Sequence, residues 1–248
     1  MLNYNSLKGY QENLAIYLEN VQETILIKAL RKIIRIVSGF FFYPREVRPV
    51  FSERLVEYPL FYHYLSLEPG QRILDFGCVE SLLPMQLCSL GYHVTGMDFR
   101  PYPFCHENFD FIQGDILKWQ PPDSGFDAVV SISVIEHVGL SGYGDPKENR
   151  GDQIAVQKLF QALKPGGRLY LTVPAGKATV KGGWYKVYDT AAIRELVPGI
   201  EALRLFYKPT RYSTWREGTS GELDVLEYDD YGAMAFAQGV AFVVARKE

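Results

Sequence analysis

The strongest constraint on the fold is an alternation of short, β-branched runs with helical segments that begins at Gln71. Several runs are apolar on both faces, which is typical of strands in a sheet covered on both sides. Each helical segment ends at Gly or Pro. This alternation predicts an α/β fold with a parallel, doubly wound sheet. We expect strands at residues 72–76, 93–98, 109–113, 128–132, 168–173, 203–207 and 240–245, and helices at residues 81–90, 153–163 and 190–197.

The connection between the second and third predicted strands, residues 99–108, departs from this pattern. It contains Pro101 and Pro103. It is barely long enough for a parallel crossover and too broken by proline for a good helix.

The chain has 248 residues, which fits one mid-sized domain with an appendage. We expect residues 1–70 to form an N-terminal helical extension and residues 71–248 to form the α/β domain. Residues 26–37 place apolar side chains on one arc of a helix and Lys and Arg on the opposite arc. Such a basic amphipathic helix can lie on an anionic membrane surface, or it can pack on the sheet domain or on a second subunit. The sequence leaves these interpretations open.

Three successive predicted strands end in an aspartate. Asp75 precedes a tight turn at Gly77, Asp98 comes 21 residues after Gly77, and Asp115 follows Gly114. Ligands of open α/β sheets bind beyond the carboxyl ends of the strands, and glycine lets the backbone approach them closely. We therefore predict a nucleotide site in which Asp98 accepts hydrogen bonds from ribose hydroxyls. Asp75 would accept hydrogen bonds from an ammonium group or brace its own loop.

Two neighbouring side chains complete the predicted nucleotide site. Phe99 would flank an adenine ring, and Ile116 would form an apolar wall while Asp115 reads an exocyclic amine. One alternative is an NAD-dependent oxidoreductase. That class needs the fuller Gly-x-Gly-x-x-Gly turn, and only the first of these glycines is present here.

As a set, these and further motifs resemble class I S-adenosylmethionine-dependent methyltransferases over about residues 70–175. The motifs are Asp75-x-Gly77, Asp98, Gly114-Asp115, Phe126-Asp127-Ala128-Val129-Val130, Val134-Ile135-Glu136-His137 and Leu163-Lys164-Pro165-Gly166-Gly167. The resemblance implies a Rossmann-like seven-stranded sheet of order 3-2-1-4-5-7-6 with an antiparallel last strand. It also implies a methyltransferase that uses S-adenosyl-L-methionine (SAM). The cofactor-binding residues that it implies are Asp75, Gly77, Cys78, Asp98, Phe99, Gly114, Asp115, Ile116 and Ser131.

The loop after the first strand departs from the family pattern. The family has Asp/Glu-x-Gly-x-Gly-x-Gly, whereas residues 75–81 read DFGCVES. The methionine part of SAM has no pyrophosphate that would require a stripped glycine cradle. However, Glu80 adds a negative charge near the place of the ligand's carboxylate. A non-catalytic binding or scaffolding protein of the same fold therefore remains an alternative.

The segment after the fourth strand carries the predicted catalytic residues. Methyl transfer from a sulfonium depends on in-line positioning, and an oxygen acceptor must also lose its proton. His137 suits the role of base because imidazole titrates near neutral pH. Glu136 and Asp145 are the other candidates, although this Glu-His pair also braces the loop or contacts the cofactor in the family. We predict no metal site, since Cys105-His106 are adjacent rather than spaced as ligands.

The acceptor is predicted from the same region. The stretches Glu136-His137-Val138-Gly139-Leu140 and Tyr143-Gly144-Asp145-Pro146 resemble a subgroup associated with surface-polysaccharide and glycan biosynthesis. Three long connections, 138–152, 175–188 and 208–239, carry aromatic side chains that suit a sugar ring. The last of them is acidic, and the net charge is −3, so nucleic acid is a poor partner. We predict O-methylation of a sugar or glycan-related small molecule.

Location is predicted from three further features. The three cysteines form no CxxC pair, and no apolar run reaches the roughly 18 residues that span a bilayer. The first twenty residues lack the layout of a secretory signal. These features predict a cytoplasmic protein. Residues 26–37 would provide its contact with the inner face of the membrane if the helix binds lipid, or a dimer contact if it packs on a second subunit.

Overall fold

The computed structural model describes Ile33 and residues 52–122, 125–142, 147–210, 212–229 and 237–248. The chain divides into two compact units, Met1–Arg48 and Pro49–Glu248, and the account below concerns the second. The predicted basic helix at 26–37 lies outside the described residues except for Ile33, so it stays a prediction. The predicted domain boundary after residue 70 also stays a prediction. Helix α3 (Arg54–Tyr64), which precedes that boundary, is part of the second unit.

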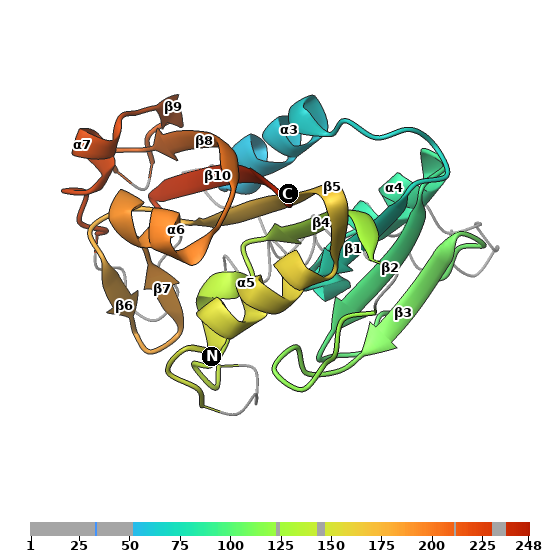
Figure 1. The fold of residues 1–248 in the computed structure, drawn as a ribbon. Coiled ribbons are helices and arrows are strands. Elements are labelled where there is room, and N and C mark those ends of the chain that lie inside the picture. Colours follow the sequence, from blue (N-terminus) through green and yellow to red (C-terminus); the bar gives the residue numbers. More distant parts are fainter. Residues whose placement is uncertain (1–32, 34–51, 123–124, 143–146, 211, 230–236) are drawn as a thin grey trace. The chain divides into compact units, whose positions relative to one another are not determined.

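Eight strands form the main sheet. They are β1 (Arg72–Phe76), β2 (His93–Asp98), β3 (Phe109–Gln113), β4 (Phe126–Ile132), β5 (Leu163–Pro174), β8 (Ile200–Tyr207), β9 (Arg216–Glu217) and β10 (Gly239–Arg246). Their order is β3-β2-β1-β4-β5-β10-β8-β9 (Figure 1). The first five strands pair in parallel, and β10 runs antiparallel to both β5 and β8.

The predicted seven-stranded sheet needs one correction. Strand β9 pairs with β8 and adds an eighth strand at the edge, so the stated order of seven is incomplete. A strand of two residues is too short to leave a period-two pattern in the sequence. The connection 175–188, predicted only as a long connection, also contains a hairpin of β6 (Thr179–Lys181) and β7 (Tyr185–Val187). Its turn uses Gly182 and Gly183, both with positive φ.

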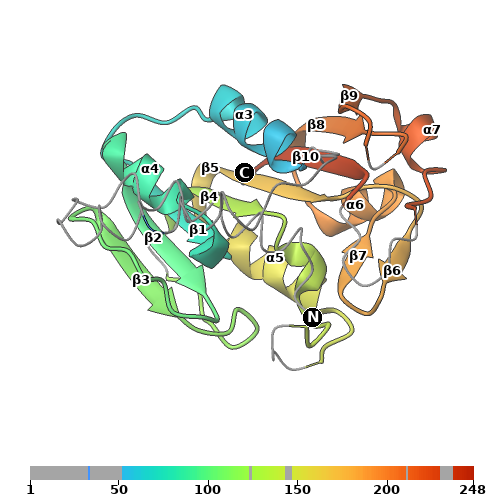
Figure 2. The same cartoon turned by 180° about the vertical axis from the view of Figure 1, so that it is seen from behind.

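Helices cover both faces of the sheet (Figures 1 and 2). The remaining helices are η1 (Cys78–Glu80), α4 (Leu83–Ser89), η2 (Ile135–His137), α5 (Gly151–Gln161), α6 (Thr190–Leu196) and α7 (Ser220–Leu223). Leu74 packs in one core with α5 and α6, whereas its neighbour Ile73 packs in a second core with α3 and α4. This alternation along β1 is what a strand buried on both faces requires. Among the described helices, none has the length and apolar composition to cross a membrane.

The connection 99–108 crosses from β2 to β3 without a helix. Tyr102 anchors this connection by aromatic packing, with its ring 5.3 Å from that of Phe104 and 5.2 Å from that of Phe109. Its hydroxyl donates to the Ser81 carbonyl at 2.9 Å. Aromatic packing therefore replaces the helical crossover that the prolines exclude.

Candidate functional site

A pocket lies at the carboxyl ends of β1, β2, β3 and β4. This is the edge at which doubly wound sheets bind their ligands. The predicted site residues that line the pocket are Asp75, Gly77, Asp98, Phe99, Gly114, Asp115, Ile116 and His137. The structure thus brings together side chains that the sequence spreads over more than sixty residues.

Gly77 makes the turn that leads from β1 into the pocket. Its φ is +81°, and its N–H donates to the Met97 carbonyl at 2.7 Å. A Cβ at this position would lie 2.5 Å from Cγ1 of Val134, in the loop after β4. Both the backbone conformation and this close approach require glycine.

Asp98, at the end of β2, is buried and holds the loop around the pocket. Its Oδ2 accepts from the backbone N–H of Val79 at 3.1 Å, and its Oδ1 accepts from that of Arg100 at 2.9 Å. Oδ2 can accept a second hydrogen bond, and a ligand hydroxyl could replace the long 3.4 Å contact that Nε of Arg100 makes to Oδ1. Asp98 is therefore placed to receive a pair of hydroxyl donors from a ribose.

From the sequence, we expected the negative charge of Glu80 to oppose binding of the ligand's carboxylate. In the structure, Glu80 is paired with a cation. Its Oε1 lies 2.6 Å from Nη1 of Arg100, and Nε of Arg100 also lies 3.4 Å from Oδ1 of Asp98. The guanidinium thus offsets two negative charges at the pocket rim. This reduces the repulsion that an anionic ligand group would meet there.

Asp75 lies at the end of β1 with 3% of its surface exposed. Burial raises the pKa of its carboxyl from 3.8 to about 8, with repulsion from Asp98 adding to the effect and Arg54 opposing it. Its Oδ2 accepts no hydrogen bond from the described residues. A cationic ligand group beside Asp75 would favour loss of this proton and would supply the donor that Oδ2 lacks.

The pKa of Asp75 predicts a pH-dependent stability. The unfolded chain ionises Asp75 from near pH 3.8 upward, whereas the folded protein retains the proton to about pH 8. The free energy of unfolding should therefore fall as pH rises through this window, by up to about 1.4 kcal/mol per pH unit. Chemical denaturation of Asp75→Asn should show a shallower slope. Asp110→Asn, at an exposed position of β3, is the control and should retain the wild-type slope.

Asp115 follows β3 and completes the row of strand-end acids. Its Oδ1 accepts from the Leu117 N–H at 2.9 Å, which fixes the side chain. Its Oδ2 accepts no hydrogen bond from the described residues and lies 3.8 Å from Nζ of Lys118. Together with Ile116, it presents a carboxylate oxygen beside an apolar wall, as reading an adenine amine requires.

Helix α3 contributes pocket residues that the sequence did not reveal. Arg54 and Tyr58 both line the pocket. Tyr58 donates to the Ser81 hydroxyl at 3.3 Å, so α3 contacts the loop after β1. A helix that precedes the sheet carries no local signal of which strand ends it will cover. The acidic and basic residues on the buried side of α3 were the sequence feature that could have indicated its place at the pocket.

The predicted catalytic pair lies on η2, directly after β4. Nδ1 of His137 lies 2.7 Å from the Trp184 carbonyl, which can accept but not donate. In neutral His137 this contact places the proton on Nδ1, and Nε2 lies 3.8 Å from Oε1 of Glu136. Glu136 is buried, and burial raises its pKa well above the ordinary value, which favours the protonated form of its carboxyl. Asp145 lies outside the described residues and stays a prediction.

Two predicted cofactor residues do not line the pocket. Cys78 and Ser131 are both buried, at 1% and 0% exposure, behind its wall. Burial raises the pKa of the Cys78 thiol, which remains protonated. Their direct contact with a cofactor stays a prediction.

The aromatic residues predicted around the acceptor are Tyr143, Trp184, Tyr185, Tyr188, Tyr212, Trp215, Tyr228 and Tyr231, and the structure gives them different environments. Trp215 is half-buried, and its Nε1 donates to the Ser52 carbonyl at 3.0 Å. Tyr185, Tyr188 and Tyr228 are buried and pack the loops. Trp184 and Tyr212 are exposed by 36% and 47%, and the Trp184 ring centroid lies 5.6 Å from that of His137. Tyr143 and Tyr231 lie outside the described residues. Trp184 is thus the aromatic side chain that the structure brings nearest to the predicted base among these residues.

The architecture is the α/β Rossmann-like fold of class I methyltransferases, with the acidic strand ends at its pocket. Solved structures show the same fold. One is phosphoethanolamine N-methyltransferase 2 of Haemonchus contortus in complex with SAM, with a TM-score of 0.53 and 14% identity, covering 78% of this chain and 53% of that one. Another is the 1,6-didemethyltoxoflavin-N1-methyltransferase of Burkholderia thailandensis with S-adenosylhomocysteine (SAH), with a TM-score of 0.52 and 14% identity, covering 92% and 91%.

Sequence relatives agree with the fold. A ubiquinone biosynthesis O-methyltransferase of Xanthomonas campestris is 31% identical over 59% of this chain and 61% of its own length. A sterol 24-C-methyltransferase of Gibberella zeae is 28% identical over 42% of this chain and 28% of its own length. The chain thus spans less than two thirds of these relatives. A family described as "Caenorhabditis protein of unknown function, DUF268" matches residues 108–219. The chain is therefore similar in sequence to methyltransferases and similar in fold to class I SAM-dependent methyltransferases.

Proposed function

We propose that the chain is a SAM-dependent methyltransferase whose acceptor is an oxygen of a sugar or glycan-related small molecule. The observation that carries the proposal is the convergence of Asp75, Gly77, Asp98 and Asp115 on one pocket at the carboxyl edge of the sheet. Each of them has a counterpart in SAM: an ammonium group, a closely approaching backbone, a ribose and an adenine amine. A dinucleotide would instead need more glycine in the first turn.

The amino-acid end of SAM fits the charges around the first turn. Its ammonium group would supply the donor that Asp75 Oδ2 lacks in the structure. Its carboxylate would meet the guanidinium of Arg54, which lines the same pocket. Because Arg100 is already paired with Glu80 and Asp98, Arg54 is the better cation for this role.

Bound SAM supplies a methyl group activated on a sulfonium, which transfers by in-line displacement. What the chain must add is orientation of the acceptor and removal of its proton. His137 is the proposed base, since its Nε2 carries the lone pair when Nδ1–H donates to Trp184. The acceptor hydroxyl would give its proton to Nε2 as its oxygen attacks. Glu136 is the poorer base because burial favours its protonated form.

A neutral sugar is the proposed acceptor because of the groups around His137. The exposed ring of Trp184 offers an apolar face beside the base, which suits the C–H face of a sugar. Residues Glu217, Glu222 and Glu227 add negative charge to the last connection, which disfavours a polyanion. A role in glycan biosynthesis and a cytoplasmic location rest on the sequence and belong to the same proposal.

Calorimetric titration with SAH tests the cofactor part of the proposal. The wild-type protein should bind SAH, and Asp98→Ala should weaken binding about 10- to 100-fold because two charge-assisted hydrogen bonds to the ribose are lost. Asp110→Ala, the same substitution at an exposed position of β3, should bind as the wild type does. If the wild-type protein fails to bind millimolar SAH, the non-catalytic alternative holds. Binding of NADH in a parallel titration would instead support the NAD-dependent oxidoreductase.

A further inference from the structure

Glu57 of α3 is a buried carboxyl that the proposed reaction does not yet use. Its side chain is 0% exposed. Its Oε1 accepts from Oγ1 of Thr172 at 2.7 Å and from Oγ of Ser133 at 2.5 Å, and its Oε2 accepts from Nη1 of Arg54 at 2.9 Å. A carboxylate removed from water needs such donors. Glu57 therefore ties α3 to the end of β5 and to the loop after β4.

Arg54 is the partner of Glu57 that reaches the pocket. Its Nη1 also donates to the Ile132 carbonyl at the end of β4, at 3.2 Å. Although burial opposes its charge, Glu57 and other neighbouring acids raise the pKa of Arg54 above its ordinary value. Both hydrogen bonds use Nη1, so Nε and Nη2 of the planar guanidinium remain as donors for a ligand.

Ser133 adds a second reason for the placement of Glu57. Its φ is +52°, a left-handed conformation that is unfavourable for a residue other than glycine. The bond from its hydroxyl to Glu57, and the bond from its N–H to Oγ1 of Thr172 at 2.9 Å, hold this conformation. The next residue, Val134, packs against Gly77 and leads to η2.

We propose that Glu57 is a positioning residue, which holds the guanidinium of Arg54 in place for the carboxylate of the cofactor's amino-acid end. The inference rests on the proposed function, because it presupposes a ligand with that carboxylate. It differs from a role in stability alone in one respect. Loss of Glu57 should weaken ligands that carry the amino-acid end and spare ligands that lack it.

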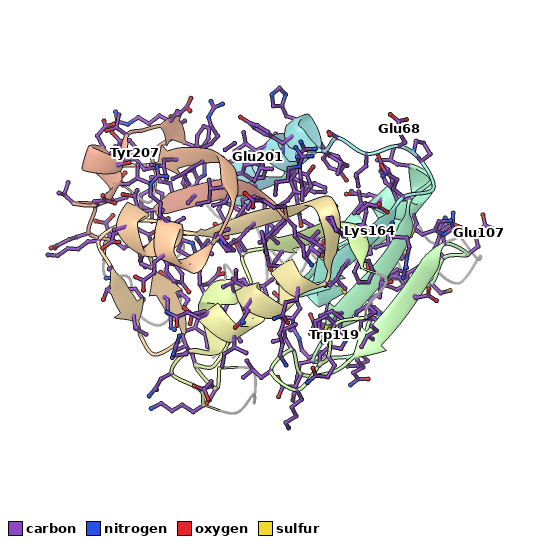
Figure 3. The ribbon with its side chains drawn as sticks, in the orientation of Figure 1. Glu68, Glu107, Trp119, Lys164, Glu201 and Tyr207 are labelled. Atoms are coloured by element: carbon purple, nitrogen blue, oxygen red, sulfur yellow. The ribbon has the colours of Figure 1, made fainter. Side chains whose placement is uncertain are left out.

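Glu57→Gln is the first test variant. The amide keeps an oxygen for the two hydroxyl donors but replaces the charged Oε2 opposite Arg54. Glu57→Asp is the second, since it keeps the charge but is one methylene too short to reach all three donors. Glu107→Gln, at an exposed position near the start of β3 (Figure 3), is the matched control.

Calorimetry with two probes gives the readout: SAH and 5′-methylthioadenosine, which has the same nucleoside but no amino-acid end. Glu57→Gln should weaken SAH about tenfold, while 5′-methylthioadenosine changes by less than about twofold. Arg54→Met should show the same selectivity. The double variant should bind SAH no more weakly than Arg54→Met alone, because Glu57 acts through Arg54.

Three results would decide against the inference or against its premise. If Glu57→Gln and Glu57→Asp weaken the binding of both probes equally, Glu57 contributes to the stability of the fold alone. Additive losses in the double variant would separate Glu57 from Arg54. If the wild-type protein binds neither probe, the proposed function fails rather than the role of Glu57.

Discussion

Replacing Gly77 with alanine is expected to remove SAH binding and to destabilise the domain by about 2–5 kcal/mol. The left-handed φ of +81° costs alanine about 1–2 kcal/mol. The new Cβ would also lie 2.5 Å from Cγ1 and 2.9 Å from Cβ of Val134, so either β1 or the loop after β4 must move, at about 1–3 kcal/mol. Movement of either segment displaces a wall of the pocket. Urea denaturation and SAH titration measure the two effects.

A second glycine separates the two causes. Gly70 has a φ of +88°, but a Cβ there would meet no described atom within 4 Å. Gly70→Ala should therefore cost about 1–2 kcal/mol and leave SAH affinity unchanged. Combining Gly77→Ala with Val134→Ala should recover part of the SAH binding. If Gly77→Ala binds SAH as the wild type does, the prediction that this turn approaches the ligand closely is wrong.

Replacing His137 with glutamine is expected to lower kcat by about 10²–10⁴ while SAH affinity stays within about twofold. Glutamine can keep a hydrogen bond to the Trp184 carbonyl, but it cannot accept the acceptor's proton. The limb of the rate–pH profile that reports deprotonation of the base should also disappear. Transfer of radiolabelled methyl from SAM to a panel of neutral sugars provides the measurement.

His63 offers a matched control for this experiment. It is exposed at the end of α3, and His63→Gln should retain the wild-type rate. A fall in SAH affinity that equals the fall in kcat/KM would assign His137 to cofactor contact instead of base catalysis. A wild-type kcat in His137→Gln would show that His137 is not the base, and Glu136 and Asp145 would be the remaining candidates.

Much of the pocket could be predicted from the sequence because its signals are local. A short apolar run that ends in Asp and Gly specifies a strand, its end and a turn within a few neighbouring residues. In a doubly wound sheet, the carboxyl ends of parallel strands then share one edge without any further information. Asp75, Asp98 and Asp115 were predicted at that edge for this reason, and the structure places them in one pocket.

Other features had no local signal. Strand β9 exists because two residues pair with the edge of β8, and η1 forms at residues 78–80, ahead of the helix that was predicted from residue 81 and that begins at Leu83 as α4. Likewise, composition does not distinguish aromatic residues that face an acceptor from those that pack a loop. The structure buries Tyr185, Tyr188 and Tyr228. Whether an aromatic side chain packs or faces a ligand depends on the shape of the space that distant segments leave around it.

The sequence by itself determined the chain order of the seven longer strands, three of the helices between them and the acidic strand ends, since these are properties of short segments. The tertiary structure alone decided that Glu57 meets Ser133 and Thr172, and that His137 meets the Trp184 carbonyl. These partners lie 47 to 115 residues apart in the chain. Such contacts depend on how whole elements pack, because a hydrogen bond between buried groups forms only where the folded core holds donor and acceptor within reach.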